Sequence, residues 1–414
     1  MTSIFKKARL LSRNQKSMLV NVLDQMFDKL DLTDTQRERI ETAYNAVGEY
    51  LASCDDPLLN GAKVYSQGSI RLRTAVKPLS KDEFDVDLIL FLPNAKHATR
   101  NEIVRVVKEH LKASKVYNDL VEDLPRGFRI NYAGDYHLDI TPAIEYDLVN
   151  SSGRPLWVVD KRNQFKESNP EGMAVTFDKC CLLQPKILIE KMSFESLSNR
   201  SVEELPNQNV KHLLNRIVQI LKRHRDIWAQ GENNKYAKFK PISVVLTTLA
   251  SKAYVEVIET GKEYSNEFDL ILDVIELMPH HIENELGQLL VANPSMRAEN
   301  YAEKWNRVED NEGLKLQEAF FDWHKSAIYS FEHLISQDNS GLDSMFESLS
   351  NSFGEKAVAI TRDGFIASIN KSREKEKLSV VLGTGALTLS SPSKADTNVT
   401  SDVSPVKRNQ FYGG

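Results

Sequence analysis

Cysteine is scarce in this sequence of 414 residues, which contains only Cys54, Cys180 and Cys181. Three cysteines are too few for a disulfide framework, and the lack of a C-x-x-C pair leaves no sign of a cysteine-based zinc site. No stretch approaches the ~18 uncharged apolar residues of a membrane-spanning helix, and the basic N-terminus lacks the apolar core of a signal peptide. We therefore expect a soluble cytoplasmic protein with reduced thiols.

Glycine, proline and an excess charge of one sign are also lacking. With 18 Gly and 14 Pro, the chain is neither collagen-like nor of low complexity. The 53 basic and 58 acidic residues leave a net charge of −5, which argues against a protein held on nucleic acid by its overall charge. Hydrophobic residues make up 41%, so the chain can bury a core, and its length predicts two or three domains.

The chain begins with a helical pattern and then changes to strands. Apolar residues recur at helical spacing over Leu19–Leu30 and Ile40–Leu51, and Thr33 with Gln36 between them predicts a capping box. From Lys63 onward, short apolar runs alternate with polar turns, which is typical of strands. We expect strands at Asp85–Leu92, Phe128–Tyr132 and Tyr136–Ala143, with a helix at Arg100–Ser114.

The helical pattern returns after Pro206, and we expect helices at Ile242–Ile258, Phe268–Met278 and Ala298–Ile328. The segment Thr384–Pro405 is rich in Ser and Thr and poor in large apolar residues. Such a segment cannot offset its ordering entropy by burial, so we expect it to be disordered. The expected organisation is a mixed α/β core with N-terminal helices at residues 1–205, a helical domain at 206–378 and a disordered tail at 379–414.

Three aspartates stand on two of the expected strands. Residues two apart in a strand share a face, so Asp85 and Asp87 point out of one face while Val86 points into a core. Asp139 likewise lies opposite its apolar neighbours. Carboxylates gathered on one face raise one another's pKa and oppose burial, and divalent cations remove this cost. Mg²⁺ prefers carboxylate and phosphate oxygens, so the pattern predicts a two-metal site for phosphoryl chemistry.

The sequence Gln67-Gly68-Ser69 precedes these strands and suits phosphate binding. Glycine permits close backbone approach, and neighbouring N–H groups together with the Ser69 hydroxyl can hold an anion. If Ile70–Ala75 opens a helix, the phosphate also lies at the positive end of that helix. Each motif alone is weak, because D-x-D pairs often mark a solvated face in a charged chain. Their order, with apolar residues flanking each aspartate, favours a functional site.

With these motifs, the sequence resembles the bacterial cGAS/DncV-like nucleotidyltransferases, or CD-NTases, of the polymerase-beta-like superfamily. The resemblance covers most of residues 40–310 and rests on GSIRLRTAV from Gly68, EFDVDLILFL from Glu83 and HLDITPAIEY from His137. It extends to Leu221–Asp226, Pro241–Leu249 and Ala298–Trp305 in the helical part. It implies an α/β (α+β) fold, in which a palm with a mixed sheet packs against a helical lobe.

The resemblance also implies residue roles. The metal ligands would be Asp85, Asp87 and Asp139, holding two Mg²⁺ ions or Mn²⁺ in their place, and the donor triphosphate would be held by Gln67, Gly68, Ser69, Lys222 and Ser243. Two plainer alternatives stay open from the residues themselves. Lys222 is a solvated lysine inside the basic run Lys222–Arg225, or Ser243 is a helix N-cap after Pro241. The basic run itself is also open to interpretation as a nucleic-acid patch.

The activity implied by the resemblance is a cyclic oligonucleotide synthase. A ribose hydroxyl attacks an α-phosphate of ATP or GTP, and the product closes into a second messenger of CBASS anti-phage defence. The best match is to clade D, which implies cyclic AMP-AMP-GMP, with another cyclic di- or trinucleotide as an alternative. The downstream effector would bind this product and not the protein, and we expect no membrane partner and no obligate nucleic acid.

Two rival functions remain. A linear poly(A)- or oligoadenylate-type nucleotidyltransferase shares the aspartates, but the negative net charge and the lack of a plain RNA-binding module disfavour it. A catalytically inactive binding module is disfavoured because all three aspartates are present.

The chain ends in Phe411-Tyr412-Gly413-Gly414. Two glycines lack side chains, so they can pass through a narrow catalytic crevice and present the terminal carboxylate. Some operons of this family encode an E1–E2-like ligase and a deconjugating peptidase, so the resemblance implies these partners and covalent conjugation through Gly414. The alternative is an incidental unstructured end.

Overall fold

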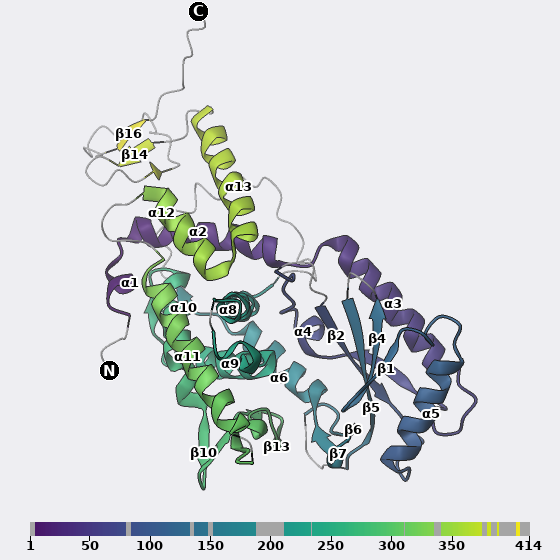
Figure 1. Cartoon of the computed structure of the whole chain (residues 1–414). Coiled ribbons are helices and arrows are strands. Elements are labelled where there is room, and N and C mark those ends of the chain that lie inside the picture. Colours follow the sequence, from purple (N-terminus) through teal and green to yellow (C-terminus); the bar gives the residue numbers. More distant parts are fainter. Residues whose placement is uncertain are drawn as a thin grey trace, which may run out of the picture.

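A computed structural model of the chain describes residues 5–79, 84–132, 136–147, 152–187, 211–232, 234–309, 311–334 and 341–374, and short strands at 379–381, 387–388 and 403–405. A mixed sheet and its helices form one lobe, and a group of helices forms the other (Figure 1). Within these ranges, no helix is long and apolar enough to cross a bilayer.

The helices are α1 (Lys7–Leu10), α2 (Arg13–Leu30), α3 (Asp34–Ala52), α4 (Gly68–Arg71), α5 (Arg100–Ala113), α6 (Pro170–Leu182), α8 (Leu213–Ala229), α9 (Ser243–Glu259), α10 (Glu267–Leu277), α11 (Glu312–Glu332), α12 (Gly341–Phe353) and α13 (Glu355–Glu374). Short 3-10 turns are η1 (Ala237–Phe239), η2 (Met278–His281) and η3 (Glu303–Asn306). The strands of the main sheet are β1 (Lys63–Ser66), β2 (Phe84–Phe91), β3 (Val121–Leu124), β4 (Gly127–Tyr132), β5 (Tyr136–Glu145), β6 (Leu156–Asp160) and β7 (Gln164–Ser168). The shorter strands are β8 (Lys186–Ile187), β9 (Glu263–Tyr264), β10 (Glu283–Glu285), β11 (Gln288–Leu290), β12 (Ala292–Asn293), β13 (Met296–Asn300), β14 (Ser379–Val381), β15 (Leu387–Thr388) and β16 (Val403–Pro405).

The main sheet is mixed, as the resemblance implies. Its strand order is β1-β2-β5-β4-β3, and β6 pairs with both β5 and β7. Strands β2 and β5 are parallel, and the other neighbours in this sheet are antiparallel. Strand β5 is long enough to pair with β4 through Ile140 and then with β6 from Ala143. This central strand therefore holds the two halves of the sheet together.

One face of the sheet is covered by α3 and α5, which lie beside it in Figure 1. Apolar side chains that alternate along the strands form the core of this lobe, among them Val86, Leu88 and Leu138. Helix α3 begins with the expected capping box, in which the Thr33 hydroxyl accepts from the Gln36 N–H. The face that points away from α3 and α5 is left for polar side chains near the start of β2.

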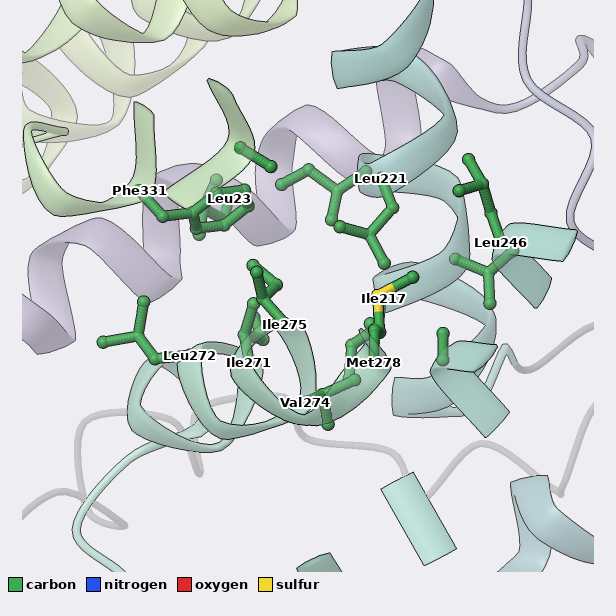
Figure 2. Packing of buried hydrophobic residues seen from close by; sticks show 14 of the residues in the cluster. Leu23, Ile217, Leu221, Leu246, Ile271, Leu272, Val274, Ile275, Met278 and Phe331 are labelled. Carbon is green, nitrogen blue, oxygen red and sulfur yellow. The ribbon is translucent and has the colours of Figure 1, made fainter. Parts of the chain in front are cut away.

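The helical lobe has a larger apolar core built on α10. Figure 2 shows Ile271, Ile275 and Met278 facing Leu23 of α2, Ile217 and Leu221 of α8, Leu246 of α9 and Phe331 of α11. Helices α1, α2 and α6 belong to this cluster. The sequence-based division placed them with the sheet in residues 1–205, but their apolar faces pack against the helical lobe.

One expected helix is wrong in its first half. Residues Ala298–Ile328 do not form a single helix, because β13, the turn η3 and a break precede α11 at Glu312. Asparagine side chains satisfy backbone groups in this stretch: Asn300 Oδ1 accepts from the Val291 N–H, and Asn306 Oδ1 accepts from the Leu289 N–H. Asn311 then adopts a left-handed conformation with φ 55°, which ends any helix before it.

Three short strands lie within the segment 379–414, and the expectation that this tail is disordered stays a prediction. Strand β14 pairs with β15 and with β16 in a small antiparallel sheet. Val380, Val381 and Val403 are β-branched residues that favour extended backbone. The remaining tail residues, Gly413 and Gly414 included, lie outside the described residues.

The core of the helical lobe yields a stability prediction. Leu221 is fully buried where α2, α8 and α10 meet, and truncation to alanine leaves a cavity there. We expect Leu221→Ala to lower the free energy of unfolding by about 2–5 kcal/mol. The same change at Leu314, which is 53% exposed, should cost no more than about 0.5 kcal/mol. Urea unfolding of both variants measures this, and equal losses would contradict the packing described here.

Candidate active site

Parallel pairing of β2 and β5 brings the three aspartates together. Asp87 lies directly opposite Asp139 across the two strands, and Asp85 lies opposite His137. Val86, between the first two, is 1% exposed and packs on the α3 side, so the carboxylates share the other face. The structure therefore places the residues as their spacing predicts, while their role in metal binding stays a prediction.

Arg129 is the residue at this site that the sequence analysis missed. It lies on β4 directly opposite Asp139. Its guanidinium donates from Nε to Asp139 Oδ1 at 2.7 Å and from Nη2 to Asp139 Oδ2 at 2.8 Å, and Nη2 also donates to Asp85 Oδ1 at 2.8 Å. Its neighbours Phe128 and Ile130 are buried, so the same alternation that revealed the aspartates was a signal for Arg129 as well.

Asp87 has the most perturbed environment of the three carboxylates. Burial, followed by the charges of Asp139 and Asp85, raises its pKa to about 6. Lys222 and Arg129 oppose this rise, and their effects on the pKa are smaller. A carboxyl group held in this state gains free energy when a cation neutralises it. The electrostatics of the site thus favour a bound cation beside Asp87.

The turn at Gly68 sits directly on Asp87. Gly68 has φ 59°, and a Cβ atom at this position would collide with Asp87 Oδ2. The Gln67 N–H donates to the Asp87 carbonyl oxygen at 2.9 Å. Only glycine meets both demands, the left-handed backbone and the close approach. The condition that Ile70–Ala75 opens a helix is not met, because α4 ends at Arg71 and Arg73 has φ 55°.

A row of polar side chains on α8 holds the segment that follows this turn. The donors are Asn215 to the Leu72 carbonyl at 2.9 Å, Gln219 to Ala75 at 2.8 Å, Lys222 to Thr74 at 2.7 Å and Arg223 to Lys77 at 2.5 Å. Their spacing places them along one side of the helix. We call this row, Asn215, Gln219, Lys222 and Arg223, the α8 seam. It joins the helical lobe to the residues next to the Gly68 turn.

The seam decides between the alternatives for Lys222. This lysine is 6% exposed, so it is not a solvated surface residue, and burial lowers its pKa to about 7. His224 within the same basic run is 2% exposed, and burial lowers its pKa to about 4. The run Lys222–Arg225 is therefore interior, and its interpretation as a nucleic-acid patch is wrong.

Ser243 is not the N-cap of α9. The N-cap is Ile242, and the Ser243 hydroxyl accepts from Arg225 Nη1 at 3.0 Å. Arg225 also forms an ion pair with Asp226, and the same carboxylate pairs with Lys240 Nζ at 3.1 Å. Ser243 thus belongs to a cluster of charged side chains at the start of α9. Arg71, at the end of α4, pairs with Asp178 of α6 at 2.8 Å.

The three carboxylates have the right chemistry to bind hard divalent cations, but in this structure they are not arranged around a common point. All three supply oxygen ligands, which suit Mg²⁺ or Mn²⁺. Among the described residues, no three His, Cys, Asp or Glu side chains converge closely enough to hold a metal ion. The guanidinium of Arg129 lies between Asp85 and Asp139, and this explains why the ligands are not gathered.

Comparisons with known proteins agree with this architecture. Residues 18–180 match the Second Messenger Oligonucleotide or Dinucleotide Synthetase domain. A c-di-GMP synthase of Roseivirga ehrenbergii is 28% identical over 98% of this chain and 100% of its own. Two solved structures share the fold. They are CdnG of Bradyrhizobium diazoefficiens in complex with GTP, with TM-score 0.60, 19% identity and 83% and 97% of the two chains covered, and E. coli CdnC with ATP, with TM-score 0.53, 14% identity and 81% and 97% covered.

The domain match at residues 18–180 and the full-length relative indicate a nucleotidyltransferase, and the solved structures share its polymerase-beta-like fold. Within that class, the chain is similar to the cGAS/DncV-like nucleotidyltransferases, the CD-NTases, through the domain matched at residues 18–180 and the full-length relative. Its assignment to clade D stays a prediction.

The buried lysine of the α8 seam yields a prediction for stability against pH. The pKa of Lys222 is about 7 in the folded chain and ordinarily 10.5. Between these values the unfolded chain binds more protons, so the free energy of unfolding rises with pH. We expect Lys222→Met to remove this rise, while the wild type gains stability from about pH 7 to about pH 10. Denaturant unfolding at several pH values measures it, with exposed Lys238→Met as the control. Parallel curves for Lys222→Met and the wild type would contradict the prediction.

Proposed function

We propose that Asp85, Asp87 and Asp139 bind two Mg²⁺ ions and join purine nucleoside triphosphates into a ring. The observation that carries this proposal is the register of β2 and β5, which sets Asp87 opposite Asp139 beneath the Gly68 turn. Bound Mg²⁺ would supply charge neutralisation at the reacting phosphate and at the attacking hydroxyl. In a related chain whose aspartates pointed to opposite faces of the sheet, the three carboxylates would not lie together beneath the turn.

The chain's own residues position the substrate. The backbone N–H groups of the Gly68 turn and the Ser69 hydroxyl would hold the donor triphosphate against the carboxylates, with Gln67 fixing the turn to Asp87. Lys222 has three donors, and the Thr74 carbonyl takes one of them, so the same ammonium can also reach a phosphate. Ser243 would act through the neighbouring Arg225. Such positioning converts encounters of two nucleotides into a reaction between held groups.

The product of this proposal contains guanosine. The full-length relative is named a c-di-GMP synthase, and the structure of CdnG holds GTP. The resemblance to clade D favours cyclic AMP-AMP-GMP made from ATP and GTP, and the curated relative supports c-di-GMP as the second candidate. Both require GTP, so a need for this substrate is common to the two. Under this proposal the messenger acts in CBASS anti-phage defence and binds a downstream effector.

Product analysis with a matched variant tests the function. The purified protein is incubated with ATP, GTP or both in Mg²⁺, Mn²⁺ or Zn²⁺, treated with phosphatase, and analysed by nuclease P1 digestion and mass spectrometry. We expect a phosphatase-resistant ring that needs GTP and forms with Mg²⁺ or Mn²⁺ but not Zn²⁺. Asp87→Asn keeps the side-chain shape and removes the charge, so synthesis should fall by two or more orders of magnitude, roughly as when charge stabilisation is lost elsewhere.

Exposed Asp123, which pairs with Lys108, serves as the control, and Asp123→Asn should keep full activity. A linear, phosphatase-sensitive product would indicate the poly(A)-type alternative. Activity that survives complete chelation of divalent ions, or full activity of folded Asp87→Asn, would refute the metal assignment.

We extend this proposal to the C-terminus, which lies outside the described residues. An E1–E2-like ligase would adenylate the Gly414 carboxylate with release of pyrophosphate. The acyl group would then pass to a cysteine thiolate with loss of AMP, and finally to a lysine amine with release of the thiol. A deconjugating peptidase would hydrolyse the resulting isopeptide bond.

The last two glycines are therefore expected to be needed for conjugation and not for synthesis. Deleting Gly413-Gly414 should abolish conjugates on co-expression with the ligase while nucleotide turnover by the isolated protein persists. Deleting Ser390-Ser391 shortens the tail equally, keeps the glycines and should leave conjugation intact. Immunoblots of both strains give the result. Conjugates that persist without the glycines, or none from the intact chain with an active ligase, would show that this end is incidental.

A further inference from the structure

The positively charged side chain of Arg129 contacts two of the three proposed metal ligands directly. Its guanidinium donates hydrogen bonds to both carboxylate oxygens of Asp139 and a third hydrogen bond to Asp85. Two other cations near the site, Lys222 and Lys240, make their hydrogen bonds to other groups. Lys222 donates to the Thr74 carbonyl, and Lys240 donates to Asp226. The guanidinium thus meets the carboxylates at the place where a metal ion would have to bind.

This contact is built into the sheet and is not a chance surface pair. Arg129 faces Asp139 in register on the antiparallel neighbour, and its side chain is 25% exposed against 17% for Asp139. A planar guanidinium that binds both oxygens of a carboxylate is stronger and more directional than a single ion pair. The sheet register therefore places a side chain that is always charged beside two of the three carboxylates.

A second acidic side chain lies on the other side of Arg129. Glu122 of β3 is directly opposite Arg129 across the β3–β4 ladder. Residues in such cross-strand pairs share a face and have Cβ atoms about 4.5–5.5 Å apart. Glu122 is exposed, and its charge acts on Arg129 in the same sense as those of Asp139 and Asp85. The guanidinium accordingly has two acidic neighbours in one row, one at the site and one at its edge.

We infer that Arg129 is a displaceable counter-cation, which occupies Asp139 and Asp85 when no metal is bound and moves toward Glu122 when metal enters. This inference rests on the proposed function of the three carboxylates. Arg129 is a positioning residue, because it acts through the aspartates. It stabilises the metal-free site against repulsion between carboxylates, and it competes with metal for the same oxygens. Metal binding without nucleotide is consequently weakened by the cost of moving Arg129.

The test measures metal binding directly and needs no turnover. Mn²⁺ is titrated into the full chain without nucleotide, with the free ion followed by electron paramagnetic resonance. Arg129→Gln removes the competing charge and keeps a polar side chain, so we expect Mn²⁺ to bind at least about tenfold tighter, within the usual range of coupling between two ligands. Arg126→Gln is the control, because Arg126 pairs with Asp160 and Glu303 away from the site. Its Mn²⁺ affinity should match that of the wild type.

The Glu122 neighbour provides an independent variant with little risk to folding. Glu122→Gln removes the acceptor for the displaced guanidinium, so Mn²⁺ should bind about threefold or more weakly than to the wild type. If Arg129→Gln does not fold, Arg129→Lys keeps the charge and loses the fork, and it should also bind Mn²⁺ more tightly. Circular dichroism confirms the fold of each variant before titration.

The outcomes separate this inference from the proposed function. Mn²⁺ binding that is the same in Asp139→Asn and in the wild type would refute the metal site itself. Binding that Asp139→Asn abolishes, but that folded Arg129→Gln leaves unchanged or weaker, would keep the metal site and overturn the role of Arg129. Unchanged binding in Glu122→Gln would overturn the movement toward that residue.

Discussion

The α8 seam is the contact on which the relation between the two lobes depends. One helix of the helical lobe donates four side-chain hydrogen bonds to carbonyl groups between Leu72 and Lys77. These carbonyls belong to an irregular segment with no strand or helix of its own to satisfy them, and an unpaired buried carbonyl costs about 1–3 kcal/mol. The segment follows immediately after the Gly68 turn. The seam therefore fixes the turn relative to the helical lobe, while β1 and β2 fix it relative to the sheet.

Charge is balanced at the site by groups that lie in four different elements. The carboxylates come from β2 and β5, Arg129 comes from β4, and Lys222 comes from α8. Burial raises the pKa of Asp87 to about 6 and lowers that of Lys222 to about 7, with each charge opposing the shift of the other. An acid and a base whose pKa values are shifted in opposite directions in one place are typical of functional sites. Under the proposed function, a metal–triphosphate would bring both a cation for Asp87 and an anion for Lys222, so its two charges would match the two perturbed groups.

Much of the sheet and of the carboxylate arrangement follows from the sequence, because a strand alternates its faces. Apolar neighbours on both sides of Asp85, Asp87 and Asp139 were enough to place the three on one face. Arg129 carried the same signal, but its contact depends on which strands pair and in what register, and periodicity does not provide that. The environment of Lys222 was hidden for a similar reason, since its partner is a main-chain carbonyl with no sequence signature. The false helix before Glu312 came from apolar spacing that asparagine side chains override.

The Gly68 turn shows how closely fold and chemistry are bound together here. Its backbone touches Asp87 so tightly that no side chain fits, and its amide at Gln67 is hydrogen-bonded to the main chain of that residue. A phosphate bound by the turn would therefore be separated from the Asp87 carboxylate only by the backbone of the turn. Two anions at such close range repel each other, and in a partly buried site the repulsion is poorly screened. A triphosphate can remain there only with a cation between the two, and a guanidinium already bound by Asp139 has few donors left for a phosphate. The geometry of the turn, together with the carboxylates, therefore supports the proposal that a metal ion completes this site.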